Sequence, residues 1–401
     1  MTTPAHQRPL RIVLAPDSLK GSLPAGEAAL AMSAGVRAAA ARQGHPAPDV
    51  VLAPLADGGE GTLDALLAAW HVGARTTACH DAAGRARTAR YGISEDHGAP
   101  GAPVRGVLEA AEANGLPLVA DRPLDALAAT SYGVGEIAVR LLDDGADEIL
   151  LCIGGSATTD GGAGLLAALG ARFLDADGAP LAPGGGALGA LATIDVTRLH
   201  PRARAVRWRI AVDVDNPLCG PRGAATVFGP QKGATPDDVV VLEAGLTRLA
   251  RVVAGSTGVD MLDVPGAGAA GGLPAVLVPF LGAEIVPGSA LVADAVGLAG
   301  ALAHADLVLT GEGSFDSQSL GGKVVHAVLA AAPAACAVVV IAGRVQLSAA
   351  QVQDAGLAAA FSLATGPMAL DELIDGAGAL MEDAAAQVYG VFSAGRGRMY
   401  G

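Results

Sequence analysis

The sequence is poor in aromatic residues, in cysteine and in positive charge, and each shortage narrows what the chain can be. Aromatic residues make up 3% of the 401 residues and hydrophobic residues 51%, so the cores must consist of Ala, Val, Leu and Ile, which suits helices packed on a Val-rich sheet. The four cysteines form no CxxC pair, which is typical of reduced thiols in a cytoplasmic protein. The formal net charge of −14 disfavours binding to nucleic acid or to anionic membranes.

Signals for export or membrane insertion are also lacking. The first residues contain no apolar signal core, so export is not expected. The stretch 324–342 is apolar enough to be tested as a membrane span, but it contains His326 and Pro333. Because Pro333 separates a helix-like half from a β-branched half, we interpret this stretch as a buried helix followed by a buried strand.

Short apolar strands alternate with helices at both ends of the chain, which predicts a parallel sheet covered by helices on both faces. The final helix is expected from about Leu370 to Val388. The region from Thr76 contains short antiparallel strands around a DAAG turn. A chain of this length favours two domains. We therefore predict an α/β fold with a discontinuous Rossmann-like domain (1–75 and 288–401) and an inserted α/β domain (76–287).

Six loops combine glycine with carboxylate, amide or lysine groups where a strand is expected to end. They are 16–22 (PDSLKGS), 56–62 (ADGGEGT), 154–162 (GGSATTDGG), 213–217 (DVDNP), 229–233 (GPQKG) and 310–316 (TGEGSFD). Ligands of open α/β sheets bind beyond the carboxyl ends of the strands. Glycine lets backbone N–H groups approach phosphate, and a following helix N-terminus adds favourable dipole charge. Each loop alone could be a capped tight turn, but six together favour a phosphate site.

Lysine usage points to the same loops. Only three of the 26 basic residues are lysines, and Lys20, Lys232 and Lys323 each adjoin a glycine. An ammonium group can follow a moving phosphoryl group as a compact cation. Phosphoryl transfer also needs Mg²⁺ held by acidic oxygens, and often a carboxylate near the attacking hydroxyl. The candidates are Asp17, Asp57, Glu60, Asp160, Asp213, Asp215, Glu312 and Asp316, and the sequence leaves their roles open.

Other signatures are absent or weak. There is no GxxxxGK[ST] segment, no HExxH segment and no GxSxG around Ser156, which disfavours a P-loop enzyme, a zinc enzyme and a serine hydrolase. The segment 266–271 matches GxGxxG, but it follows Pro265 rather than a clear strand. An NAD-dependent hydroxy-acid oxidoreductase therefore remains an alternative, as does a non-catalytic sugar-acid-binding protein with a kinase-like fold.

The loops together closely resemble the bacterial type-1 glycerate kinases. The resemblance is carried by PDSLKGS, LADGGEGT, GGSATTDGGAG, DVDNPLCGPRGAATVFGPQKGA, PGAGAAGG and TGEGSFDSQSLGGK, in the family's order from residue 11 to about 326. It implies two α/β domains with the active site in a cleft between them. It also implies transfer of the ATP γ-phosphoryl group to D-glycerate, commonly giving 2-phosphoglycerate. A homodimer is one compatible assembly.

The resemblance also implies a set of site residues. It implies catalytic roles for Asp17, Lys20, Asp160 and Lys232, and metal binding by Asp213 and Asp215. The residues implied to bind glycerate or ATP are Ser22, Asp57, Glu60, Gly154, Gly155, Ser156, Thr158, Asn216, Glu312 and Asp316. Lys20 or Arg344 is expected to hold the substrate carboxylate, and Asp17 is a candidate proton acceptor.

Overall fold

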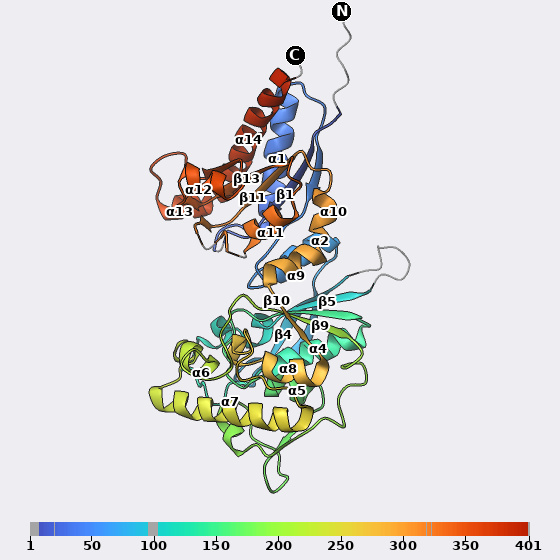
Figure 1. The fold of residues 1–401 in the computed structure, drawn as a ribbon, viewed down its shortest axis with the longest axis vertical. Coiled ribbons are helices and arrows are strands. Elements are labelled where there is room, and N and C mark those ends of the chain that lie inside the picture. The colour runs from blue at the N-terminus through green and yellow to red at the C-terminus, as the bar shows by residue number, and fades with distance from the viewer. Residues whose placement is uncertain (1–7, 20, 95–102, 318, 322, 400–401) are drawn as a thin grey trace, which may run out of the picture. The chain divides into compact units, whose positions relative to one another are not determined.

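The chain folds into two compact units (Figure 1). The computed structural model describes residues 8–19, 21–94, 103–317, 319–321 and 323–399. The first unit comprises the described residues of Met1–Asp57, Asp64–His71 and Val292–Gly401, and the second those of Gly58–Leu63 and Val72–Leu291. Lys20, one of the predicted catalytic residues, lies outside the described residues.

The first unit contains a five-stranded parallel sheet. Its strands are β1 (Arg11–Pro16), β2 (Asp49–Leu52), β11 (Leu307–Gly311), β13 (Ala337–Ala342) and β15 (Ala359–Ser362), in the order β15–β13–β11–β1–β2. Two short strands, β12 (Ser314–Phe315) and β14 (Arg344–Val345), pair in parallel beside it. The helices are α1 (Ala25–Arg42), α2 (Thr62–Trp70), α9 (Gly288–Ala295), α10 (Leu298–Leu302), α11 (Val324–Ala331), α12 (Ala349–Asp354), α13 (Leu370–Asp375) and α14 (Ala377–Met399), of which α2 and α9 begin in residues of the second unit.

Helices cover both faces of this sheet. On one face, Ile12, Leu309 and Ile341 pack in one buried cluster with Met32 of α1 and Met381 of α14, and these two helices run side by side (Figure 1). Residues one position along each strand point to the opposite face, and they are buried as well, beside α11. The predicted α/β class is confirmed, and the apolar stretch 324–342 is a helix followed by a strand, as predicted.

One predicted helix is wrong. The stretch expected to form a single helix from Leu370 to Val388 is two helices, α13 and α14, separated at Gly376. Gly376 has φ −90° and ψ 0°, and its N–H donates to the carbonyls of α13. Glycine costs about 1 kcal/mol relative to alanine inside a helix, so it is a natural place for the first helix to end.

The strand order of the first unit places two candidate residues together. Along the chain the order corresponds to 2-1-3-4-5, in which the connections leave β1 and β11 in opposite directions. Ligands of such sheets bind at this switch point, at the carboxyl ends of the two strands. Asp17 follows β1 and Glu312 follows β11, and the N–H of Asp17 donates to the carbonyl of Gly311 (2.7 Å).

The second unit contains a mixed six-stranded sheet. Its strands are β3 (Arg75–His80), β4 (Ala86–Ile93), β5 (Arg105–Glu109), β6 (Glu148–Cys152), β9 (Arg207–Ala211) and β10 (Glu284–Val286), in the order β10–β9–β6–β5–β4–β3. The four strands from β10 to β5 are parallel. Strands β4 and β3 are antiparallel around the DAAG turn, as the sequence predicted. The antiparallel pair β7 (Arg172–Leu174) and β8 (Thr193–Asp195) lies apart. The helices are α3 (Ala111–Asn114), α4 (Tyr132–Asp143), α5 (Ala163–Ala168), α6 (Ala224–Phe228), α7 (Pro236–Thr257) and α8 (Pro274–Leu281).

Helix α7 shows how local sequence sets the elements of this unit. Thr235 caps its first turn, and its side chain and that of Asp238 each accept a backbone N–H of the other residue. Pro236 occupies the first helical position, and Gly258 ends the helix in the left-handed region. Leu242, Leu246, Leu249, Ala250 and Val253 are buried, and this spacing is one apolar face of a helix laid on the core.

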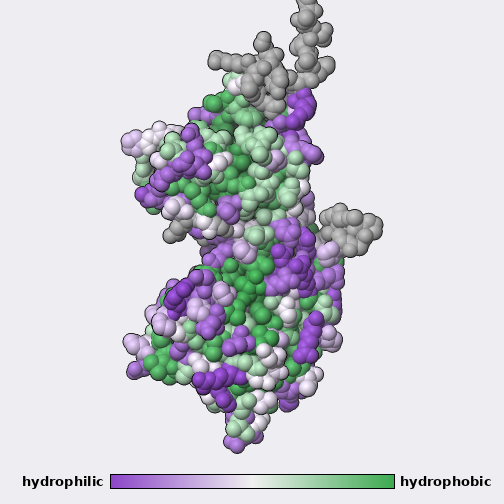
Figure 2. Space-filling view, in the orientation of Figure 1, coloured by the Kyte–Doolittle hydropathy of each residue, from purple (hydrophilic) through white to green (hydrophobic). Residues whose placement is uncertain are grey.

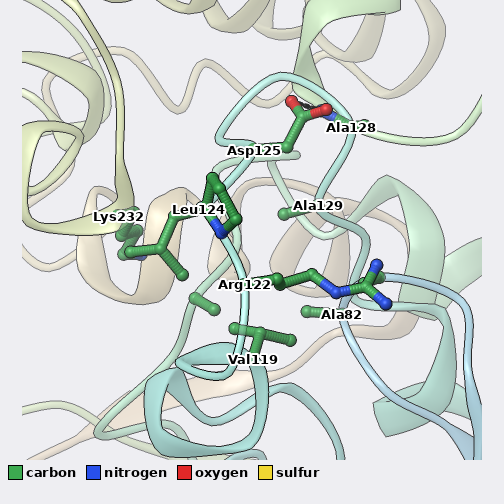
Figure 3. A pocket seen from close by; sticks show the side chains of 11 residues that line it. Ala82, Val119, Arg122, Leu124, Asp125, Ala128, Ala129 and Lys232 are labelled. Atoms are coloured by element: carbon green, nitrogen blue, oxygen red, sulfur yellow. Dashed lines mark hydrogen bonds between the residues drawn. The ribbon is translucent and has the colours of Figure 1, made fainter.

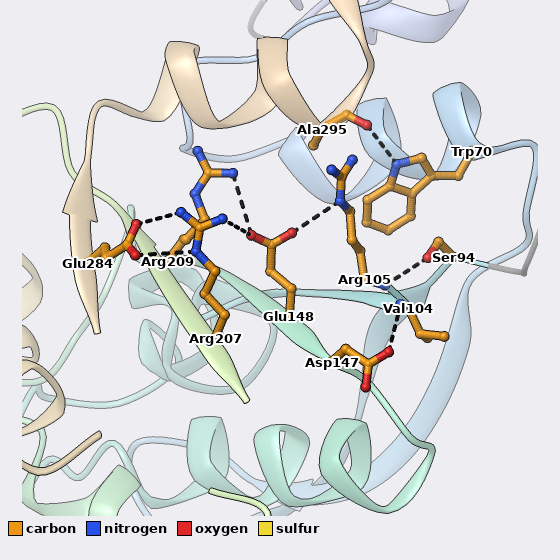
Figure 4. A network of polar contacts seen from close by, with 10 residues as sticks. All are labelled: Trp70, Ser94, Val104, Arg105, Asp147, Glu148, Arg207, Arg209, Glu284 and Ala295. Carbon is orange, nitrogen blue, oxygen red and sulfur yellow. Dashed lines mark hydrogen bonds and ion pairs between the residues drawn. The ribbon is translucent and has the colours of Figure 1, made fainter. Parts of the chain in front are cut away.

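A charged network crosses the opposite, amino-terminal ends of the parallel strands (Figure 4). Glu148 on β6 is buried, with Arg105 of β5 and Arg207 of β9 as its neighbours in register. Its Oε2 lies 3.1 Å from Nε of Arg105, and its Oε1 lies 3.5 Å and 3.6 Å from NH1 of Arg207 and Arg209. Glu284 of β10 pairs with Arg207 at 2.9 Å. The buried carboxylate of Glu148 thus interacts with three guanidinium groups.

We expect Glu148→Ala to destabilise the second unit by about 3 kcal/mol, because removing one partner of a buried ion pair leaves the other charges unpaired. Glu284→Ala is the matched control, since its side chain is 48% exposed and an exposed pair contributes at most about 1 kcal/mol. Urea unfolding followed by fluorescence of the buried Trp208 measures both. Equal losses for the two variants would contradict the central role of Glu148.

Within the described residues, no helix is long and apolar enough to cross a membrane. The displayed face of each unit carries hydrophobic and hydrophilic side chains intermixed (Figure 2). Leu370 and Val391 are examples of exposed apolar side chains, at 70% and 74%. A hydrophobic share of 51% is therefore not entirely buried in the two cores.

Candidate active site

In the second unit, the carboxyl ends of the parallel strands bring together several of the predicted loops. Gly154 and Gly155 follow β6, Asp213 follows β9, and Gly288 follows β10. Gly58, from the second predicted loop, lies so close to this edge that a Cβ there would be 2.7 Å from both Ala211 and Gly288. Its φ of 85° is one that favours glycine. Glycine is therefore required at this crossing of loop and strand ends.

The glycine-rich loop after β6 is held by the segment that follows α3. The N–H of Leu116 donates to the carbonyl of Gly155 (2.9 Å), and the N–H of Ala157 donates to the carbonyl of Asn114 (2.7 Å). The side-chain Nδ2 of the buried Asn114 donates to Oγ1 of Thr158 (3.0 Å). The loop is therefore a fixed structure. Asn114 was not predicted from the sequence, where only its Asn-Gly pair marks a turn.

Asp160 anchors the end of this loop. Its Oδ2 accepts hydrogen bonds from the N–H and Oγ of Ser131 (2.8 and 2.9 Å) and from the N–H of Gly164 (3.1 Å), and its Oδ1 accepts one from the N–H of Gly162 (3.1 Å). The hydroxyl of Ser131 in turn accepts the N–H of Leu165 (2.9 Å). Asp160 is 1% exposed, and these bonds give it a structural role in joining α4 to α5.

This arrangement corrects one expectation. The sequence suggested that the N-terminus of the helix after the loop would offer its N–H groups to a phosphate. In the structure, the first N–H groups of α5 donate to Asp160 and Ser131 instead. A carboxylate and a hydroxyl within the chain satisfy these donors, so the helix end is already capped.

Lys232 is the cation of this site. It is 3% exposed, and its Nζ donates to Oγ of Ser156 (3.0 Å) and to the carbonyl of Thr158 (2.6 Å). Burial lowers the pKa of Lys232 from 10.5 to about 7, against the opposing attraction of Asp160. Lys232 thus contacts Thr158 and Ser156, which lie 74 and 76 positions before it in the sequence. All three are predicted site residues.

The GxGxxG segment supports the same loop. Gly271 has φ 72°, and a Cβ on it would lie 2.0 Å from the carbonyl oxygen of Thr158. Its own carbonyl accepts the N–H of Gly161 (3.0 Å). The segment contains a short 3₁₀ turn at Ala269–Gly271 rather than a strand-to-helix turn. These glycines allow close packing against the loop, and the dinucleotide fingerprint that the NAD alternative rested on is not formed.

The first unit carries a separate group of carboxylates. Glu312 is 8% exposed, and its Oε1 has no hydrogen-bond partner among the described residues. Burial raises the pKa of Glu312; a hydrogen bond from Ser319 and the charge of Lys323 oppose this rise, whereas Asp316 and Asp57 add to it. Asp17 is also buried, and its Oδ1 accepts the N–H of its neighbour Ser18 (2.6 Å).

The remaining predicted residues are less closely engaged. The hydroxyl of Ser22 donates to the carbonyl of Ile374 (3.0 Å), which is a structural contact. Glu60 is exposed. Nδ2 of Asn216 donates to the carbonyl of Arg222 (2.8 Å), and the guanidinium of Arg222 pairs with Asp215 (2.7 Å). Arg222 therefore organises this loop, although no sequence motif indicated it.

The two predicted metal ligands have the donor chemistry that Mg²⁺ prefers. Asp213 Oδ1 accepts the N–H of Gly288 (2.8 Å), which orients the carboxylate. A hydrogen bond from Arg222 lowers the pKa of Asp215, and the two side chains are 65% and 76% exposed. Among the described residues, no group of three or more His, Cys, Asp or Glu side chains could hold a metal alone. The pair fits a cation that arrives with nucleotide, which needs only one or two protein carboxylates.

The doubly wound fold, the fixed glycine-rich loop, the buried lysine and the strand-end carboxylates together define an α/β phosphotransferase. Comparisons with known proteins agree. The model of the glycerate kinase family matches residues 12–393. The chain is 40% identical to a glycerate kinase of Halalkalibacterium halodurans over 94% of its length and 97% of that protein's. It is 42% identical to a glycerate 2-kinase of Escherichia coli K12, covering 92% and 94% of the two chains.

A solved structure gives the same result. A crystal structure from Salmonella typhimurium LT2 described as glycerate kinase 2 superposes with a TM-score of 0.85 at 41% identity, covering 97% of this chain and all of that one. The chain belongs to the glycerate kinase family. It is accordingly an enzyme, a phosphotransferase with an alcohol group as acceptor.

Proposed function

We propose that this enzyme transfers the γ-phosphoryl group of ATP to the C2 hydroxyl of D-glycerate, giving 2-phospho-D-glycerate and ADP. The observation that carries the proposal is the contact of Lys232 with Ser156 and Thr158 of the glycine-rich loop. The name of the Escherichia coli relative, glycerate 2-kinase, supports the position of transfer.

The reaction breaks the bond between the γ-phosphorus and the β–γ bridging oxygen, and it forms a bond from that phosphorus to the glycerate oxygen. Charge spreads over the phosphoryl oxygens in the transition state. In the second unit, Lys232 supplies positive charge to these oxygens, and the backbone around Ser156 provides a rigid support. A cation fixed before the reaction begins stabilises such charge without reorganisation.

The hydroxyl proton must leave as the new bond forms. In the first unit, Asp17 is our candidate acceptor. The acidic group there also contains Asp57, Glu312 and Asp316. Burial keeps the pKa of Glu312 raised. A positioned base contributes roughly 10²–10⁴-fold to such a step. Catalytic roles for Asp17 and Lys20 remain proposals based on the family resemblance.

Asp213 and Asp215 are our proposed ligands for Mg²⁺. When bound, Mg²⁺ neutralises charge on the nucleotide phosphates. We expect Asp213→Asn to raise the Mg²⁺ concentration needed for half-maximal activity by roughly 10-fold, because one ionised ligand is lost. Asp294→Asn, on α9 in the first unit, is the control. An unchanged Mg²⁺ titration for Asp213→Asn would remove that residue from the metal site.

A coupled assay of ADP release tests the proposed activity. The enzyme is supplied with ATP and Mg²⁺, and D-glycerate is added last. We expect ADP release that requires D-glycerate, ATP and Mg²⁺ together. ADP release that is unchanged by D-glycerate would contradict the proposal.

We also propose a cytoplasmic location and a homodimeric assembly. All four cysteines are free thiols, and Cys79 and Cys152 are buried, which supports a reducing compartment. Light scattering of the purified chain measures the assembly directly, and a monomer mass would contradict the dimer.

A further inference from the structure

A cavity of about 270 Å³ lies within the second unit, beside the glycine-rich loop (Figure 3). Most of its lining is small and apolar, including Ala82, Val119 and Ala157. Ala157 is the neighbour of Ser156 in the loop, and Lys232 lines the same cavity. The cavity therefore adjoins the group of residues to which we assign phosphoryl transfer.

One arginine, Arg85, joins two of the chain segments that line this cavity. Arg85 ends the turn that contains Ala82, and its Nε lies 2.5 Å from Oδ2 of Asp81. Its NH2 donates to the carbonyl of Leu118 (2.6 Å), and its NH1 donates to Asp121 (2.7 Å). Two chain segments that line the cavity are thus joined by one guanidinium, so the cavity exists before any ligand arrives.

Three charged side chains line the cavity, and two of them are cations: Lys232 and Arg122. Figure 3 shows Lys232 and the guanidinium of Arg122 on opposite sides. Arg122 is exposed and has no hydrogen bond or ion pair with any described residue. The third group, Asp125, accepts the N–H groups of Leu127 and Ala128 (3.2 and 3.0 Å) with Oδ1. The net charge of the lining is positive in a chain whose overall charge is −14.

We propose that this cavity is the acceptor subsite and that Arg122 binds the carboxylate of the hydroxy acid. The inference rests on the proposed function and assigns a specificity residue to it. A planar guanidinium matches a carboxylate in bidentate geometry. The volume lies just below the range of about 300–1,000 Å³ that is usual for small-molecule sites. It suits a three-carbon acid and is too small for a nucleotide. Arg122 is an alternative to Lys20 and Arg344, the carboxylate anchors expected from the sequence.

Steady-state kinetics of Arg122→Gln tests the assignment at saturating ATP and Mg²⁺. We expect KM for D-glycerate to rise roughly 10-fold, as for the loss of one charge-assisted hydrogen bond. We expect kcat to change less than about 3-fold and KM for ATP to stay unchanged, because Arg122 acts on binding alone. Arg251→Gln on α7 is the matched control, since Arg251 is exposed and also has no partner among the described residues. It should behave as the wild type.

A neutral acceptor separates recognition of the carboxylate from other effects. Glyceramide replaces the carboxylate by an amide, so Arg122→Gln should reduce kcat/KM for glyceramide far less than for glycerate. Arg122→Lys, which keeps the charge, should recover part of the loss. Equal losses with both acceptors, or a rise confined to KM for ATP, would overturn the inference.

Calorimetric titration of D-glycerate into the protein without nucleotide separates this inference from the proposed activity. If the wild type binds glycerate and Arg122→Gln binds it at least roughly 10-fold more weakly, the subsite is supported even when no ADP is released. Equal affinity of the two proteins, or no binding by either, overturns the subsite and leaves the assay of ADP release to decide the activity.

Discussion

Lys232→Met is expected to lower kcat by roughly 10²–10³-fold, as removal of one preorganised electrostatic group does in other enzymes. The ammonium group is the buried cation in contact with the glycine-rich loop, through Ser156 and Thr158. Methionine has a similar length and no charge. Steady-state kinetics at saturating substrates measures the loss, and circular dichroism checks that the variant is folded. A kcat within a few-fold of the wild type would show that Lys232 does not act on the phosphoryl group.

The pH dependence of kcat/KM tests whether the charged form of Lys232 is the active one. Because burial lowers the pKa of Lys232 to about 7, the free enzyme loses this cation as pH rises through 7. The activity parameter kcat/KM reports the free enzyme, so it should fall above that pH if the charged form acts. Bound phosphate favours the charged form, so kcat should persist to higher pH than kcat/KM.

The free energy of unfolding of the wild type, relative to Lys232→Met, should rise with pH, whereas kcat/KM should fall. The folded pKa of about 7 lies below the ordinary value of 10.5, so the unfolded chain binds more protons between these two values. The stability of the wild type relative to Lys232→Met should therefore rise with pH across this window, by at most about 1.4 kcal/mol per pH unit. Below pH 7 the lysine is charged in both states and the cost of burying it is fully present. A pH-independent difference between the two proteins would contradict a buried, perturbed lysine.

Asp160→Ala is expected to destabilise the second unit by about 3–5 kcal/mol. The substitution leaves the hydroxyl and N–H of Ser131 and the N–H groups of Gly162 and Gly164 without their acceptor. Each unsatisfied buried group costs about 1–3 kcal/mol, with partial relief from relaxation or water. Urea unfolding measures the loss.

Asp175→Ala is the matched control for this second prediction. Asp175 also accepts two backbone N–H groups in a turn, from Asp177 and Ala179, but that turn is exposed. Its loss should cost about 1 kcal/mol or less, because water replaces the acceptor. If Asp160→Ala kept its stability while kcat collapsed, Asp160 would be acting on the substrate, as the family resemblance implied, and its anchoring role would be wrong.

The sequence predicted the elements of the fold well because their signals are local. The strand 337–342 and the hairpin around residues 81–84 follow from β-branched runs and turn residues, and both are observed. The single helix expected from Leu370 is instead two helices, because Gly376 ends the first of them inside a long helical pattern. Lys232 could be singled out by composition, since lysine is rare in this chain.

The parts that could not be predicted depend on contacts between distant segments. Ser131 and Asp160 are 29 positions apart, and Asn114 and Thr158 are 44 apart. No local pattern indicates which serine or asparagine will reach a given loop. Ser131 precedes α4 but makes no side-chain cap there, and its hydroxyl accepts the N–H of Leu165 in another helix, α5. The cavity beside Lys232 arises in the same way, from turns that meet only in the folded unit.

Phosphorus NMR of the reaction mixture tests the central claim most directly. After incubation of the enzyme with ATP, Mg²⁺ and D-glycerate, a phosphate ester at C2 couples to one proton and gives a doublet, whereas an ester at C3 couples to two protons and gives a triplet. We predict a new doublet that grows as the γ-phosphate signal of ATP disappears. Loss of ATP to inorganic phosphate alone, with no ester signal, would contradict the account.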